Sequence, residues 1–217
     1  QNISSAAKIF NIAEEDYIRA ASHQPNLFVQ KSETLKQNLS DLSDTSKINE
    51  ADLIKAGLRN PNIFYRKPES SKENILKIAE VFNISAKEVS KAALREPSLF
   101  YRNPETLREN FLKISEEFNI PPKSLLRAVL RQPSVIVLKP ETIIQNIKIS
   151  AELFNVKEED FVKAALLSAN LFYQKPETLK QHLCESAKIF NVKEQDFLKV
   201  ALKSPNLFEI CFYTNTT

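Results

Sequence analysis

Apolar residues recur along the chain at spacings of three, four and seven residues, with polar and charged residues between them. In one segment the stripe positions are Leu107, Phe111, Ile114, Ser115 and Phe118. This spacing predicts an amphipathic helix with one buried stripe. A second, shorter helix is predicted where the acidic residues at 158–160 precede Phe161, Ala164 and Ala165.

The predicted helices have recognisable ends. Pro-Glu-Thr, as at 104–106, favours a helix start, because proline suits the first turn and an acidic side chain suits the helix dipole. Phe-Asn-Ile, as at 118–120, favours a helix end, because Asn readily adopts the left-handed cap conformation. The second helix is predicted to stop before Pro-Asn-Leu-Phe, as at 25–28, a short segment suited to a 3₁₀ turn.

These signals return every 36 residues without insertion or deletion. The sequence therefore predicts an all-α fold, a right- or left-handed superhelical α-solenoid of six 36-residue helix–helix–3₁₀ repeats in a single domain over 1–211. The repeats are a partial first copy at 1–31 and full copies at 32–67, 68–103, 104–139, 140–175 and 176–211, with a polar tail at 212–217. One aromatic position recurs on the stripe, and we expect its residues to belong to the core: Phe10, Phe82, Phe118, Phe154 and Phe190.

Composition argues against several classes of protein. The single glycine, Gly57, argues against P-loop, Rossmann and all-β folds, which need glycine in loops and turns. No apolar run approaches the roughly 18 residues of a membrane helix, and no signal peptide is visible. We therefore expect no membrane partner and an intracellular, reducing compartment (an organelle or a bacterial cytoplasm), in which Cys184 and Cys211 are free thiols. A start at Gln1 rather than Met is typical of a fragment or a processed chain.

Catalytic chemistry has little support in the sequence. The two histidines, His23 and His182, lie at different positions of different repeats, and no Cys/His set has the spacing of metal ligands. The carboxylates recur at helix starts, where they suit the helix dipole. We expect no enzymatic activity, no catalytic residues, no metal and no cofactor.

The clearest functional candidate is a pair of basic columns. The first column is basic in all six copies: Arg19, Lys55, Lys91, Arg127, Lys163 and Lys199. The second lies four residues later on the same helix face and holds Arg59, Arg95, Arg131 and Lys203, with His23 and Leu167 in the other copies. Arg66 and Arg102 follow the short turn. In stacked repeats these positions would form a continuous stripe suited to a polyanion.

Two observations favour purely structural roles for polar columns. In five copies the first basic column has an acid three residues earlier, as in Asp16 before Arg19, and such pairs stabilise an exposed helix by roughly 0.2–0.5 kcal/mol without any ligand. A column near the start of the first helix contains Asn2, Asn38, Asn74, Asn110, Asn146 and His182. Asn can bond to base edges, but we favour a capping or inter-repeat role.

The end of the second helix and the segment after it carry a family resemblance. They read Leu-Ile-Lys-Ala-Gly-Leu-Arg-Asn-Pro-Asn-Ile-Phe at 53–64 and Leu-Leu-Arg-Ala-Val-Leu-Arg-Gln-Pro-Ser-Val-Ile at 125–136, with Arg-Lys-Pro-Glu at 66–69. Over residues 1–211 the unit resembles the repeat of the mitochondrial transcription termination factor family. The resemblance implies a curved α-solenoid whose basic groove binds nucleic acid in organellar transcription or RNA metabolism. The strict 36-residue register departs from that family, whose repeats vary in length.

The columns and the resemblance together predict a monomeric nucleic-acid-binding protein that contacts DNA, preferably double-stranded, rather than RNA. The alternative is a solenoid that binds a partner protein in its concave face, as a scaffold or effector-type module. The net charge of +3 is too small to decide between the two.

Overall fold

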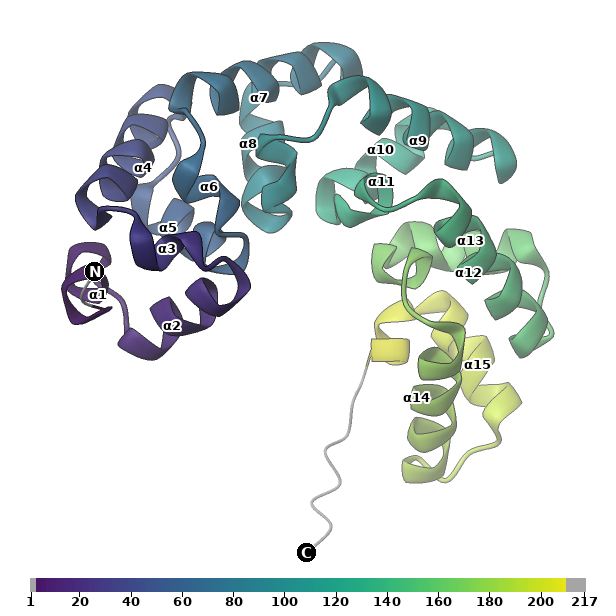
Figure 1. The fold of residues 1–217 in the computed structure, drawn as a ribbon. Helices are drawn as coiled ribbons and strands as arrows, with labels where there is room; N and C mark the ends of the chain where they lie inside the picture. The colour runs from purple at the N-terminus through teal and green to yellow at the C-terminus, as the bar shows by residue number, and fades with distance from the viewer. Residues whose placement is uncertain (1–2, 210–217) are drawn as a thin grey trace, which may run out of the picture. The chain divides into compact units, whose positions relative to one another are not determined.

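The computed structural model describes residues 3–209, and every regular element in that range is a helix (Figure 1). The predicted all-α class is therefore confirmed. Asn2, Cys211 and the polar tail 212–217 lie outside the described residues. The chain divides into two compact units, Gln1–Arg108 and Glu109–Thr217, and the single domain over 1–211 stays a prediction. None of the helices in the described range is long and apolar enough to span a membrane.

Two longer helices and one short helix alternate along the chain at 36-residue steps. The first helices are α1 (Ile3–Phe10), α4 (Ser32–Ser46), α7 (Pro68–Phe82), α9 (Pro104–Glu117), α12 (Pro140–Phe154) and α14 (Pro176–Ile189). The second helices are α2 (Glu14–His23), α5 (Glu50–Arg59), α8 (Ala86–Arg95), α10 (Pro122–Arg131), α13 (Glu158–Leu167) and α15 (Glu194–Lys203). Proline begins α7, α9, α12 and α14, as the Pro-Glu steps predict.

The short elements take two conformations. η1 (Pro97–Phe100), η2 (Ala169–Phe172) and η3 (Pro205–Glu209) are the predicted 3₁₀ turns. In contrast, α3 (Asn26–Val29), α6 (Asn62–Tyr65) and α11 (Ser134–Val137) are single α-helical turns, so the 3₁₀ prediction was wrong for these three copies. The difference is small physically, because both forms bond the same few carbonyls at one turn.

Left-handed Asn residues end the first helices as predicted. Positive φ angles between 48° and 53° occur at Asn11, Asn83, Asn119, Asn155 and Asn191. At Asn83 the cap is complete, because its N–H and that of Ile84 both bond to carbonyls of the last turn of α7. The second copy differs: Lys47 holds the left-handed position there, with φ of 58°.

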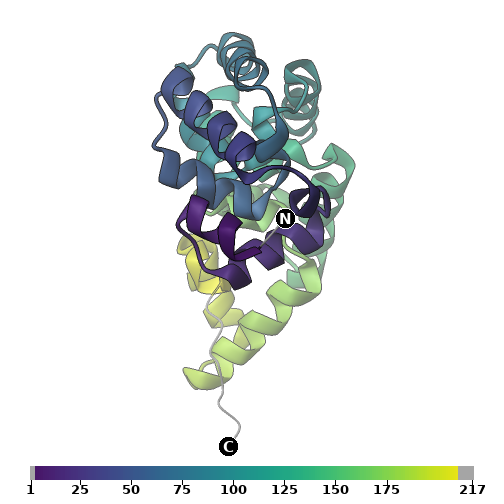
Figure 2. The ribbon, with the colours of Figure 1, turned by 60° about the vertical axis from the view of Figure 1, so that its left-hand side comes forward.

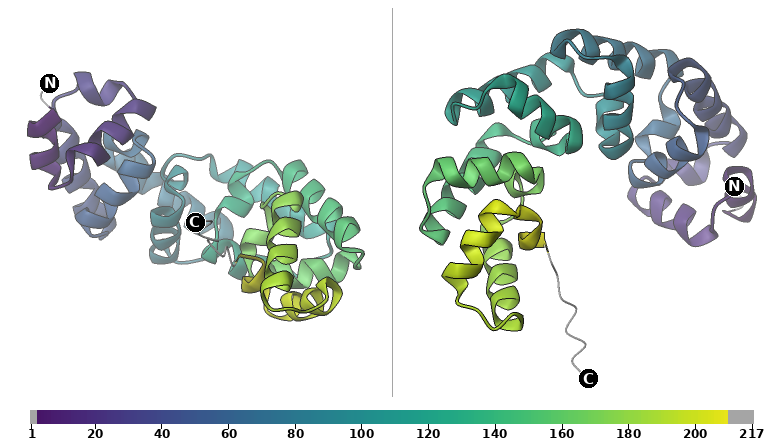
Figure 3. Two further views of the ribbon diagram at one scale, coloured as in Figure 1. Left: turned by 90° about the horizontal axis from the view of Figure 1, so that it is seen from below. Right: turned by 180° about the vertical axis from the view of Figure 1, so that it is seen from behind.

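Each unit is built of two layers of helices. In the first unit α4 packs between α1 and α7, while α5 packs between α2 and α8, so equivalent helices of successive copies lie side by side (Figure 2). In the second unit α12 packs against α14, and α13 packs against α10 and α15 (Figure 3). The apolar stripe of each helix is thereby buried against its neighbours.

The aromatic column is less uniform than predicted. Phe10 and Phe154 are buried, but Phe82 and Phe118 are only half-buried, and Phe190 is 52% exposed. Expecting all five in the core was therefore wrong.

The residue seven positions later explains the half-buried pair. Phe10 stacks on Tyr17, and Phe154 stacks on Phe161 at a ring distance of 5.9 Å. The same position holds Val89 after Phe82 and Leu125 after Phe118, and neither of these two side chains is aromatic.

Phe190 is exposed for a different reason. It stacks on Phe197, but it belongs to the last described helix pair, α14 and α15. Ile189, Val192 and Val200 on the same pair are also exposed. No further helix pair follows within the described residues to cover this face.

This difference predicts unequal effects of truncation. Phe154→Ala should lower the free energy of unfolding by roughly 3–5 kcal/mol, because it leaves a cavity beside Phe161 and Phe208. Phe118→Ala should cost only about 1–2 kcal/mol, because the ring already has contact with water. Urea denaturation followed by circular dichroism measures both values, and equal losses would contradict this account of the core.

Candidate nucleic-acid interface

The first basic column lies on the second helix of each copy, and all six of its residues are exposed: Arg19, Lys55, Lys91, Arg127, Lys163 and Lys199. Three of them form salt bridges with the acid three residues earlier, at 3.7 Å for Arg19–Asp16, 3.0 Å for Lys163–Asp160 and 3.1 Å for Lys199–Asp196. The hydrogen bond that Lys163 donates to Asp160 raises the pKa of Lys163. These three basic side chains nevertheless remain 71–74% exposed, so they are accessible to a ligand.

Arg127 is the member of the column without such an acid, because Ser124 occupies that position. Its side chain makes no ion pair or hydrogen bond with any described residue. Lys91 lies near Glu88, whose pKa is lowered mainly by hydrogen bonds from Ser85 and only slightly by the charge of Lys91. The column therefore mixes paired and unpaired cations on an exposed surface.

The second column has a role that the sequence analysis missed. Arg59 at the end of α5 donates to the carbonyl of Leu94 in the last turn of α8. Arg131 at the end of α10 donates to the carbonyls of Leu166, at 2.5 Å, and Leu167, at 3.2 Å, in the last turn of α13.

Each guanidinium thus satisfies carbonyls at a helix end that have no partner within their own helix. The positive charge also lies at the negative end of the neighbouring helix dipole. The acceptors are 35 and 36 residues ahead in the chain. Arg95, the remaining arginine of this column, also has an interaction partner. The second column therefore joins neighbouring copies within a unit.

The other predicted basic residues differ in their surroundings. Arg66 places its guanidinium over the Tyr101 ring, 5.0 Å from the centroid, which is a cation–π contact. Arg102 and Lys203 are exposed, at the end of the short segment and in the last turn of α15.

In four copies the Asn column ties the short segment to the first helix of the same copy. Asn38 donates to the carbonyl of Phe64 at 3.0 Å, Asn74 to that of Leu99 at 2.8 Å, and Asn110 to that of Ile136 at 2.8 Å. His182 has the same place in the last copy, with Nδ1 3.0 Å from the carbonyl oxygen of Phe208. These bonds stay within one copy, so they give the Asn residues a local capping role and not an inter-repeat one, and their amides are occupied rather than open to bases.

Other chemistry is sparse in the part of the chain that the structure describes. Its His, Cys, Asp and Glu side chains form no group that could hold a metal ion. Cys184 is a free, half-buried thiol, and burial is the main cause that raises its pKa. A raised pKa leaves less of the reactive thiolate at neutral pH.

Comparison with known proteins does not assign the chain to a family. No model of a protein family matches the chain, and none of the curated proteins does.

The two basic columns predict that two neighbouring substitutions on α10 will differ in their effect on the free energy of unfolding. Arg131→Gln should lower the free energy of unfolding by about 1 kcal/mol, because the carbonyls at the end of α13 lose a charged donor. Arg127→Gln, one turn earlier, should change it by less than about 0.5 kcal/mol. Urea titration of both variants tests this, and equal stability of Arg131→Gln and the wild type would remove the proposed link.

Proposed function

We propose that the six copies stack as one α-solenoid and that the first basic column binds the phosphates of nucleic acid, preferably duplex DNA. The helix–helix–short helix order recurs at a constant step, and equivalent helices lie side by side in both units. A constant step places equivalent residues at regular intervals along a stacked array. The resemblance of the unit to mitochondrial transcription termination factors supports the same function.

The observation that carries the proposal is the exposure of one basic side chain per copy. Salt bridges of the kind formed by Arg19, Lys163 and Lys199 contribute little when exposed, so exchanging the acid for a phosphate costs little. Each phosphate contact also releases condensed counterions, which favours binding. Arg127 can bind without any exchange.

We propose fewer phosphate-contacting residues than the sequence alone predicts. Arg59, Arg131 and Arg66 have structural partners within the protein, and we assign them to stability. The proposed phosphate contacts are Arg19, Lys55, Lys91, Arg127, Lys163 and Lys199, with Arg102 and Lys203 at the margin. No base-reading residue is proposed, because the Asn column is already bonded to the backbone.

One observation favours a partner protein instead. The acids that precede the basic column make the same face nearly neutral in most copies, as with Asp160 beside Lys163. Alternating charges suit a polar protein surface better than a uniformly anionic backbone.

Duplex DNA binding at several salt concentrations separates these functions. Replacing Lys55 and Arg127 together by Gln should weaken binding to all duplexes about equally, because phosphate contacts do not read sequence. The slope of log affinity against log salt should fall by about 0.9 for each lost contact. Fluorescence anisotropy with two unrelated duplexes measures both quantities.

Arg131→Gln is the matched control, because it removes a cation from the same helix as Arg127 but from the structural column. It should lower stability and leave the salt slope unchanged. If the wild-type chain shows no salt-dependent binding to duplex DNA or to RNA, the phosphate assignment is wrong and the protein-binding function replaces it.

A further inference from the structure

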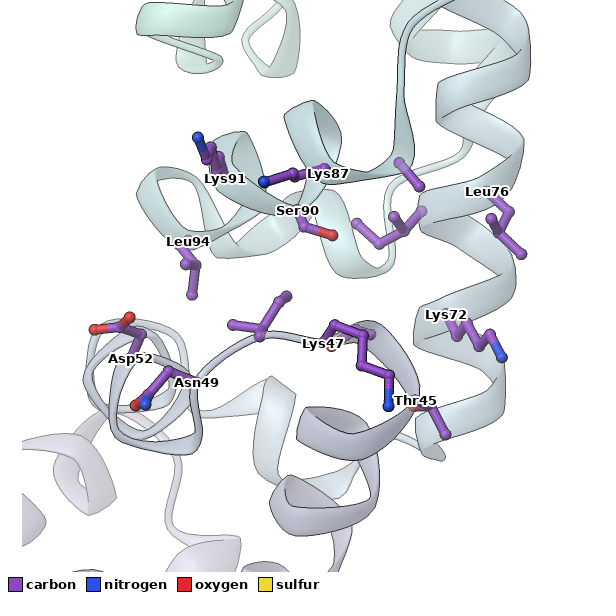
Figure 4. Close-up of a pocket in the computed structure, with 14 residues that line it drawn as sticks. Thr45, Lys47, Asn49, Asp52, Lys72, Leu76, Lys87, Ser90, Lys91 and Leu94 are labelled. Carbon is purple, nitrogen blue, oxygen red and sulfur yellow. The ribbon is translucent and has the colours of Figure 1, made fainter.

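A cavity of about 630 Å³ lies in the first unit, between α4–α5 on one side and α7–α8 on the other (Figure 4). The end of α4 and the loop after it contribute Ser46, Lys47 and Ile48. Ile75 and Leu76 on α7 and Leu94 on α8 add apolar walls. We propose that this cavity binds a small amphipathic anion, an aliphatic or aromatic body that carries one carboxylate or sulfonate group.

The cavity exists because two positions are small in these copies alone. Ser46 stands where the other five copies have phenylalanine: Phe10, Phe82, Phe118, Phe154 and Phe190. Ser90 stands where the others have a branched aliphatic residue: Ile18, Ile54, Leu126, Val162 and Leu198. Both serines line the same cavity, so apolar volume is missing from its two sides at once.

The exposed apolar lining is what a ligand body would cover. Leu76 is 50% exposed, whereas the other lining residues Ile48 and Ile75 are buried. A volume of this size lies within the range of roughly 300–1,000 Å³ typical of small-molecule sites. Covering Leu76 with an apolar ligand would remove this surface from water.

The charges around the cavity select an anion. Four of its lining residues are lysines (Lys47, Lys72, Lys87 and Lys91) and one, Asp52, is acidic, so their sum is +3. Figure 4 shows Lys87 and Lys91 on one side of the space, Lys47 on the opposite side and Lys72 on the flank formed by α7. The cavity therefore favours a ligand that combines negative charge with an apolar body.

Two of these lysines mark departures from the repeat pattern. Lys36 and Lys180, two of the four residues equivalent to Lys72, form salt bridges with Glu50 and Glu194. Ala86 stands at the position of these acids in the third copy, and the Lys72 side chain has no ion pair with any described residue.

Lys47 replaces the left-handed Asn of all other copies and has a φ of 58°. Lysine tolerates this conformation less well than asparagine does. The second copy therefore has a cation, Lys47, at the cavity, although asparagine would suit this backbone conformation better.

The test uses the full chain and the fluorescent anion 1-anilinonaphthalene-8-sulfonate as probe. Decanoate should displace the probe at one site per chain. Decanol and decyltrimethylammonium have the same chain length without the negative charge, and both should displace it much more weakly. Methyl NMR shifts of Ile75, Leu76 and Leu94 on adding decanoate should locate the site.

Filled variants provide the structural test. Ser46→Phe and Ser90→Leu install the residues of the other copies from opposite sides of the cavity, and each should weaken binding at least about tenfold. Circular dichroism confirms folding of each, and the pair keeps the test valid if one of them fails to fold. Equal binding by the wild type and a folded filled variant would place the ligand elsewhere and overturn the proposal.

Charge variants test the choice of an anion. Lys72→Gln should weaken decanoate binding roughly two- to fivefold. Lys47→Asn should weaken it similarly while raising the melting temperature, a combination that a purely structural lysine would not show. Lys77→Gln is the control, because Lys77 is on the same helix but outside the cavity, paired with Glu73 at 2.7 Å.

Several results would overturn the proposal: no binding of either anion, equal binding of the neutral and cationic analogues, or displacement of the probe by an acidic peptide but not by decanoate. Lys91 lines the cavity and also belongs to the first basic column, whereas Lys47 and Lys72 lie outside both columns. Lys47 and Lys72 variants therefore test decanoate binding without removing a proposed phosphate contact, and their DNA affinity should stay unchanged.

Discussion

The structure depends on one constraint: a pair of short helices has more apolar surface than it can bury by itself. Each unit meets this constraint by placing equivalent helices side by side, so that α4 contacts both α1 and α7, and α13 contacts both α10 and α15. A constant 36-residue step makes the arrangement self-consistent, because a face that fits one neighbour fits the next. Where no described neighbour follows, at α14 and α15, Phe190 and Val200 remain exposed.

Short helices leave many backbone N–H and carbonyl groups at their ends without a partner in the same helix, and the polar columns supply hydrogen bonds to some of them. Left-handed Asn residues cap the first helices, the Asn38 column bonds the short segments, and Arg59 and Arg131 bond the ends of neighbouring second helices. A polar residue that recurs at every step is therefore explained first by a backbone group that also recurs at every step. Recurrence alone is weak evidence for a ligand.

The local features of this fold could be predicted from the sequence, since helix starts, Asn caps and i,i+3 pairs depend on residues close together in the chain. The depth of burial could not. The half-buried Phe118 is followed seven residues later by Leu125 and the buried Phe154 by Phe161, and the apolar pattern does not distinguish these two positions. The acceptors of Arg131 lie in the next copy, so its bonds to the end of α13 could be recognised only once the helix ends were placed. The sequence shows Ser46 in a column of phenylalanines, but only the structure shows that Ser46 and Ser90 line the same cavity.

A repeat array therefore carries two kinds of information about function. Columns that stay the same maintain the stacking, and a ligand that binds along them must be one that repeats too, as phosphates do along a duplex. Positions that break a column cannot serve such a ligand along the whole array, because they occur once. Ser46, Lys47 and Ser90 each break a column that is otherwise uniform in kind, and all three line one cavity. Ser46 and Ser90 lack the apolar volume of the other copies, and Lys47 suits the left-handed conformation less well than Asn, which is the expected cost of a site that is specific to one place in the chain.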